Sequence, residues 1–94
     1  SYMREQPRLS ALGVGEEARV CRVEAASALR RRLMDLGLVP GTRVTCVGKS
    51  PAGDPAAYAF RGAVIALRRA DAEEVCLFAG AELPLEEEAV GAWD

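Results

Sequence analysis

The alternation of apolar and polar residues along the chain predicts short β-strands and one helix. Residues 16–24, EEARVCRVE, alternate with a period of two, which predicts a half-buried first strand. From Ser27 the period changes, and Leu29, Leu33 and Leu36 stand at positions i, i+4 and i+7. These positions form one stripe along a helix. We therefore expect a short helix directly after the first strand.

The segment that follows this helix carries the signals of a helix end and a tight turn. Gly37 can adopt the left-handed conformation that ends a helix, and Leu38 is expected to fold back on Leu33, as in a Schellman motif. Pro40 and Gly41 suit the two central positions of a type II turn. The sequence therefore predicts a sharp corner between the helix and the next strand.

Four more strands are expected after this corner. Residues 43–49 are rich in β-formers, residues on either side of Gly62 indicate a hairpin, and residues 75–78 form a last strand after one helical turn. Five short strands with one inserted helix, in about 70 residues, favour a mainly β fold over a parallel sheet, which needs repeated helical crossovers. The natural candidate is a small SH3-like antiparallel barrel.

Length and charge divide the chain into three parts. A chain of 94 residues fits one domain, because a second core would have too little sequence to bury its apolar surface. We expect residues 1–8 to be a flexible lead, residues 9–78 the domain, and residues 79–94 an acidic, mobile tail. That tail holds five acidic side chains and no basic one, although the net charge of the whole chain is only −2.

Composition also argues against several classes of protein. The three cysteines, Cys21, Cys46 and Cys76, are odd in number and widely spaced, so the sequence does not indicate a disulfide framework. We expect them to be free cysteines that act as small apolar residues in strands, in a reducing cytoplasm. The chain has no histidine and no arrangement of nucleophile and base, so we expect no enzyme, no metal site and no cofactor. No long apolar run indicates membrane insertion, and the weakly charged domain disfavours nucleic-acid binding.

Three separated motifs resemble the FeoA family, the small cytoplasmic proteins associated with the bacterial ferrous iron transporter FeoB. They are RRLMDLGLVPGTRV at residues 31–44, GDP at residues 53–55, and RG followed by LRR at residues 61–69. The resemblance runs from about Leu9 to Phe78, and the family often has a tyrosine where this chain has Ala63. It implies an SH3-like barrel with an inserted helix, and a regulator that acts on the GTPase part of FeoB.

The corner and the adjacent arginines are the surface that we expect to contact this partner. The predicted contact residues are Arg31, Arg32, Met34, Leu38, Val39 and Pro40. The predicted structural residues are Leu33, Leu36, Gly37, Pro40, Gly41 and Gly62. For the arginines, a solvated helix face is the alternative interpretation. For Leu38, Val39 and Pro40, and above all for Leu38, the alternative is that they only pack the corner.

A different class of function stays open from the sequence. A similar barrel occurs at the C-terminus of iron-dependent repressors, so the alternative is a self-associating or metal-responsive regulatory module. Weak homo-oligomerisation is compatible with either function. The sequence leaves open the oligomeric state and the direction of any effect on GTP hydrolysis.

Overall fold

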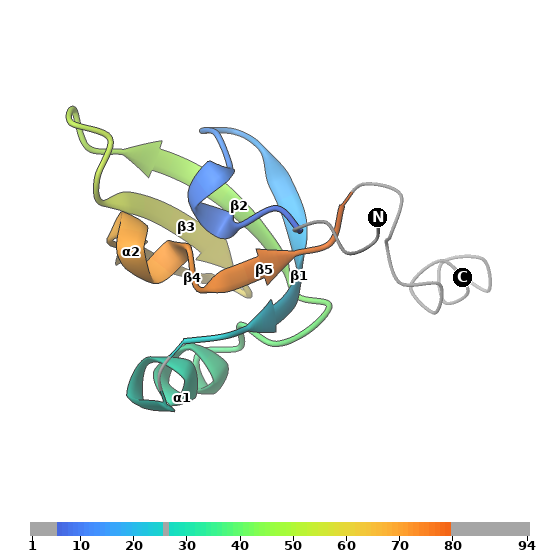
Figure 1. Ribbon diagram of the computed structural model, residues 1–94. Coiled ribbons are helices and arrows are strands. Elements are labelled where there is room, and N and C mark those ends of the chain that lie inside the picture. The colour runs from blue at the N-terminus through green and yellow to red at the C-terminus, as the bar shows by residue number, and fades with distance from the viewer. Residues whose placement is uncertain (1–5, 26, 80–94) are drawn as a thin grey trace.

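The computed structural model describes residues 6–25 and 27–79. Within them lie five strands, two α-helices and one 3-10 turn (Figure 1). In chain order these are η1 (Leu9–Ala11), β1 (Glu17–Val23), α1 (Ser27–Asp35), β2 (Arg43–Lys49), β3 (Ala56–Phe60), β4 (Ala63–Leu67), α2 (Arg69–Ala72) and β5 (Val75–Leu77). The expected set of five strands, with a helix after the first, is confirmed.

The five strands form one antiparallel sheet in the order β4-β3-β2-β1-β5. The sheet is strongly curved, and α1 lies at its lower side in Figure 1, apart from η1 and α2. Strands β3 and β4 form the expected hairpin, in which Phe60 pairs with Ala63. Its two loop residues, Arg61 and Gly62, have positive φ angles of 52° and 81°, as the type I′ turns of such hairpins require.

A single cluster of buried side chains fills the curved sheet. Leu33 of α1 and Leu38 beyond it are fully buried in this cluster, beside Val20, Val44 and Tyr58 from three strands. The cluster therefore joins the corner after α1 to the sheet. Burying such side chains contributes about 1.5–3 kcal/mol each.

The predicted apolar stripe of α1 is correct for Leu33 but wrong for Leu36. Leu36 is 38% exposed, because α1 ends at Asp35 and the chain has already begun to turn away from the core. Leu29 is half-buried and packs against the edge of the core. Leu36 therefore does not belong to the buried core.

Strand β1 also departs from a simple alternation. Its pairing with β5 shifts between Val20 and Arg22, so Val20 is fully buried while Arg22 is exposed, although the pattern placed them on one side. A bulge of this kind inserts one residue and reverses the side-chain direction after it.

The first described residues are attached to strand β5. We expected Pro7 and Arg8 to belong to the flexible lead, but both are attached to β5. The Pro7 carbonyl accepts a hydrogen bond from the Leu77 amide, and Arg8 forms an antiparallel β-bridge with Cys76. Of the expected acidic tail, residues 80–94 lie outside the described residues. Within residues 6–25 and 27–79, no helix has the length and apolar character needed to span a bilayer.

Candidate functional site

The end of α1 is closed by a Schellman motif, as the sequence predicted. The Leu38 amide donates to the Leu33 carbonyl at 2.9 Å, and the Gly37 amide donates to the Met34 carbonyl at 3.0 Å. Gly37 has a φ of 105°, which glycine adopts without a steric penalty. The chain therefore reverses abruptly and directs Leu38 back into the core.

The predicted type II turn follows at once, and Thr42 stabilises it. The Thr42 amide donates to the Val39 carbonyl at 2.9 Å, and Gly41 has a φ of 91°. The buried Thr42 hydroxyl donates to the Gly37 carbonyl at 2.8 Å and accepts from the Val39 amide at 3.1 Å. We did not single out Thr42 from the sequence, although threonine in a turn commonly bonds nearby backbone groups.

Strand β1 is hydrogen-bonded to this corner. The Gly41 amide donates to the Val20 carbonyl at 2.7 Å, and the Val20 amide donates to the Thr42 carbonyl at 2.9 Å. The guanidinium of Arg19 donates to the Gly41 carbonyl at 2.8 Å. Hydrogen bonds from Arg19 and Val20 of β1 to Gly41 and Thr42 therefore fix the corner to the sheet.

The loop between β3 and β4 packs against the corner through Arg61 and Gly37. A Cβ atom on Gly37 would lie 2.6 Å from Cδ and 3.0 Å from Nε of Arg61, closer than real contacts allow. Arg61 and Gly37 come from two of the motifs noted in the sequence, 24 positions apart. The positive φ of Gly37 is the main reason why a residue without a side chain suits this position, and the Arg61 side chain would also have to move to admit one.

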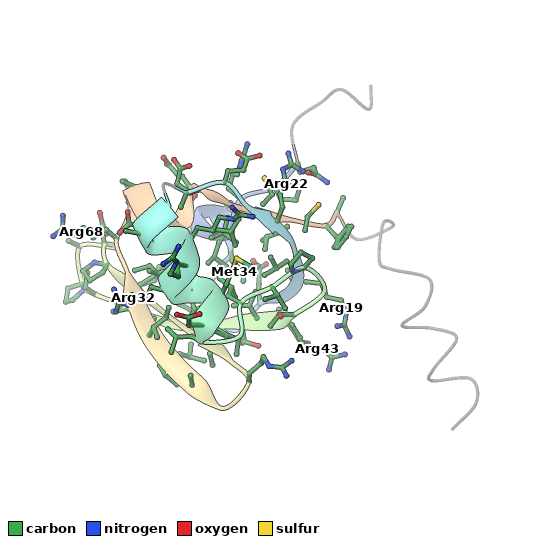
Figure 2. All side chains as sticks on the ribbon, turned by 90° about the horizontal axis from the view of Figure 1, so that it is seen from below. Arg19, Arg22, Arg32, Met34, Arg43 and Arg68 are labelled. Atoms are coloured by element: carbon green, nitrogen blue, oxygen red, sulfur yellow. The ribbon has the colours of Figure 1, made fainter. Side chains whose placement is uncertain are left out.

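The predicted contact residues differ in how accessible they are. Arg31, Arg32, Met34 and Pro40 are exposed, and Val39 is half-buried. In Figure 2, which views the molecule from below, α1 lies in front of the strands and carries Arg32 and Met34. Leu38 was wrongly included among the contact residues: the Schellman reversal buries its side chain completely, so it packs the core and cannot touch a partner.

Two shallow depressions flank the exposed face of α1. The first lies between α1 and β4, lined by Ala28, Arg31, Arg32, Asp35, Leu36 and Ile65. The second lies on the helix itself, lined by Arg30, Arg31, Met34 and Asp35. Both combine guanidinium groups with apolar surface, a composition that protein interfaces favour.

A family model described as the FeoA domain matches residues 8–77 of the chain. The chain belongs to the FeoA family. Among curated proteins, it is 37% identical over 68 residues to an Fe(2+) transport protein A/Fe(2+) transporter FeoB fusion protein of Porphyromonas gingivalis. That match covers 72% of this chain but 8% of the relative, so the chain corresponds to a small part of it.

Solved structures of FeoA proteins share the fold. The solution structure of Chlorobium tepidum FeoA is 42% identical, with a TM-score of 0.71 over 79% of this chain and 72% of that one. Stenotrophomonas maltophilia FeoA, an SH3 domain protein solved in complex with zinc, is 34% identical, with a TM-score of 0.70 over 81% of this chain and 93% of that one. The expected SH3-like fold of the FeoA family is thus confirmed.

A manganese-dependent transcriptional repressor has a similar fold. It is 18% identical, with a TM-score of 0.67 over 81% of this chain and 44% of the repressor. At this identity the likeness shows a shared fold and does not favour the alternative function.

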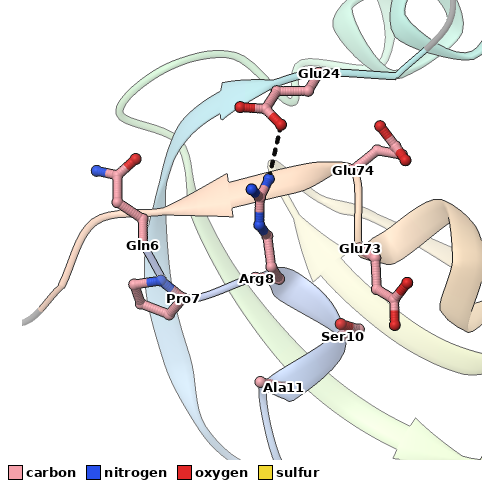
Figure 3. A pocket seen from close by; sticks show the side chains of 8 residues that line it. All are labelled: Gln6, Pro7, Arg8, Ser10, Ala11, Glu24, Glu73 and Glu74. Carbon is pink, nitrogen blue, oxygen red and sulfur yellow. Dashed lines mark hydrogen bonds and ion pairs between the residues drawn. The ribbon is translucent and has the colours of Figure 1, made fainter. Parts of the chain in front are cut away.

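Away from the corner, this FeoA-family chain has a charged cluster beside the N-terminal segment (Figure 3). The Glu24 carboxylate accepts from Arg8 at 2.9 Å and from Arg22 at 2.8 Å, and the Cys76 thiol lies 3.4 Å away. Side-chain hydrogen bonds lower the pKa of Glu24 to about 2. The bond from Arg8 has the largest effect, followed by the bond from the Cys76 thiol and the bond from Arg22. This cluster ties the segment before η1 to β1 and β5.

Its chemistry is that of a structural ion pair. Burial raises the pKa of Cys76, so its thiol stays protonated at neutral pH and is a poor nucleophile. In the part of the chain that the structure describes, no three His, Cys, Asp or Glu side chains are grouped so as to hold a metal ion.

Proposed function

We propose that this member of the FeoA family is a non-enzymatic cytoplasmic adaptor that binds a FeoB-type membrane GTPase and regulates its GTP-driven uptake of ferrous iron. The observation that carries the proposal is the P. gingivalis relative, whose name joins the two proteins in one chain. Fusion of two polypeptides in a relative supports their association where they are separate chains. The S. maltophilia FeoA is itself named as a candidate activating factor of ferrous iron transport.

The corner and the outer face of α1 are the contact surface in this proposal. We define this corner surface as Arg31, Arg32, Met34, Val39 and Pro40. Hydrogen bonds on both sides of the turn fix the backbone beneath it, so little conformational freedom is lost when a partner binds. Arginine and methionine are both enriched in protein interfaces.

The two arginines give this surface its preference for an acidic partner. Neither Arg31 nor Arg32 forms an ion pair with another described residue, and both are exposed. A guanidinium can bind a carboxylate through two parallel hydrogen bonds, and it loses little hydration when it does so. We therefore expect the FeoB surface that docks here to carry aspartate or glutamate beside apolar side chains.

Pull-down with the cytoplasmic part of FeoB tests the proposal. The wild-type chain should retain the FeoB fragment, and Arg31→Glu combined with Arg32→Glu should retain much less. Lys49→Glu is the matched control, because Lys49 is an exposed cation at the opposite end of β2 from the corner. Absence of binding by the wild-type chain would reject the function, and equal binding by all three would reject the surface.

A further inference from the structure

We propose that the acidic residues 80–94 of this chain dock on its own corner surface and on the adjacent Arg30, in competition with a partner. The docking follows from the geometry and charge of the described residues. The competition rests in addition on the function proposed above.

The described chain ends close to the corner. The Phe78 amide donates to the Arg19 carbonyl at 2.9 Å, and the guanidinium of the same Arg19 donates to the Gly41 carbonyl at 2.8 Å. Leu77 pairs with Val20, which is itself hydrogen-bonded to the turn. In Figure 1 the end of β5 and the loop between α1 and β2 lie on the same side of the molecule. The described chain therefore ends beside Arg19, and Arg19 is itself hydrogen-bonded to the turn.

The acidic residues are near enough in sequence to reach α1. Glu86 follows Ala79 by seven positions, which corresponds to at most about 23 Å of extended chain. The nine residues of α1 span only about 13 Å along the helix axis. The docking therefore requires that the arginines of α1 lie within this length of Ala79.

Charge and apolar character are complementary between the two parts of the chain. The described residues hold eleven basic and eight acidic side chains, a net charge of +3, whereas residues 80–94 hold five acidic and no basic side chain. The three consecutive arginines, Arg30 to Arg32, are exposed and have no ion pair within the described residues. Leu83 and Leu85 precede the three glutamates, and two large apolar side chains are exposed at the end of the helix: Met34 in α1 and Leu36 directly after it.

A connection of this length makes weak contacts effective. A short flexible connection gives the attached segment an effective concentration in the millimolar range, so contacts that are weak between separate molecules are populated within one chain. Each exposed ion pair contributes only about 0–1 kcal/mol. Docking is therefore reversible, and a partner with a larger contact area can displace the segment.

Fluorescence of the full chain tests the docking without any partner. Trp93 is the single tryptophan of the sequence, so acrylamide quenching reports on residues 80–94 alone. In low salt the wild-type Trp93 should be shielded, and Arg31→Glu with Arg32→Glu should raise its quenching constant at least about twofold. Raising the salt from about 0.1 M to about 1 M, which shortens the Debye length from about 10 Å to about 3 Å, should do the same. Lys49→Glu should leave the constant unchanged.

Amide chemical shifts supply a second measurement in the same protein. Replacing Glu86, Glu87 and Glu88 with glutamine should shift the amide signals of α1 and of residues 39–41, and leave those of residues 48–50, at the opposite end of β2 from the corner, in place. Quenching that is the same in all variants and at both salt concentrations, together with unchanged α1 signals, would overturn the docking. That result would leave the binding of FeoB to be decided by the pull-down.

Discussion

The side chain of Arg61 lies directly against the backbone of Gly37, where a Cβ would approach its Cδ to 2.6 Å. This contact joins the loop of the β3–β4 hairpin to the end of α1. Gly37 also ends the helix on which the exposed arginines stand, so the contact lies next to the corner surface.

Gly37→Ala should destabilise the fold. The φ of 105° costs a residue with a Cβ about 1–3 kcal/mol, and the new methyl group must also displace Arg61. The midpoint of urea unfolding measures this loss. Gly48→Ala is the matched control, because no atom lies within 4 Å of a Cβ at that position, and it should change stability by less than about 0.5 kcal/mol. Equal midpoints for the two variants would contradict the packing of Arg61 on Gly37.

Thr42→Val should weaken the corner, whereas Thr42→Ser should not. Valine has a similar shape but removes the hydroxyl that bonds Gly37 and Val39. The two backbone groups are part-buried and still bond each other at 3.0 Å, so the loss should be about 0.5–1.5 kcal/mol. Serine keeps the hydroxyl and both bonds. Thermal unfolding monitored by circular dichroism compares the two variants. A valine variant as stable as the serine variant would show that these hydrogen bonds contribute little.

Leu38→Ala and Met34→Ala should separate core packing from surface contact. Leu38 is fully buried, so its truncation should cost about 2–5 kcal/mol of unfolding free energy. Met34 is 41% exposed, and its truncation should cost less than about 0.5 kcal/mol while weakening binding to FeoB. Chemical denaturation gives the first quantity and a binding titration the second. A stable Leu38→Ala chain that fails to bind would restore Leu38 as a contact residue.

The ion pairs of Glu24 should make stability depend on acidic pH. The pKa of Glu24 is about 2 in the folded chain, below its ordinary value of 4.5, so its stabilisation is present above about pH 4.5 and is lost as the pH falls towards 2. Glu24→Gln should therefore be less stable than the wild type at pH 7 and nearly equal to it at pH 2. Urea midpoints across this range test the sign. Glu73→Gln, at an exposed residue without an ion pair among the described residues, should show no such trend.

The corner could be predicted from the sequence because its determinants are local. The positive φ of Gly37 and Gly41, the reversal at Leu38 and the turn at Pro40 each depend on residues within one helical turn or one β-turn. The five strands could be predicted for the same reason, since alternation and turn residues are read within short windows.

The features that sequence reasoning missed depend on contacts between distant segments. Nothing near Gly37 in the sequence indicates that Arg61 lies against it, and nothing in the alternation of β1 shows the bulge after Val20. Leu36 fits the helical stripe, but α1 ends one residue before it. Leu38 was counted as a contact residue although the predicted Schellman ending already turned it towards Leu33, and its complete burial excludes that contact.

The dissociation constant of the complex with the cytoplasmic part of FeoB tests the central claim most directly. The claim is that a rigid corner presents arginines of α1 to an acidic partner. By calorimetric titration, Arg31→Glu with Arg32→Glu should raise the dissociation constant about tenfold or more, equivalent to about 1.4 kcal/mol, whereas Lys49→Glu should leave it unchanged. A dissociation constant that is the same for the wild type and both variants would contradict the claim.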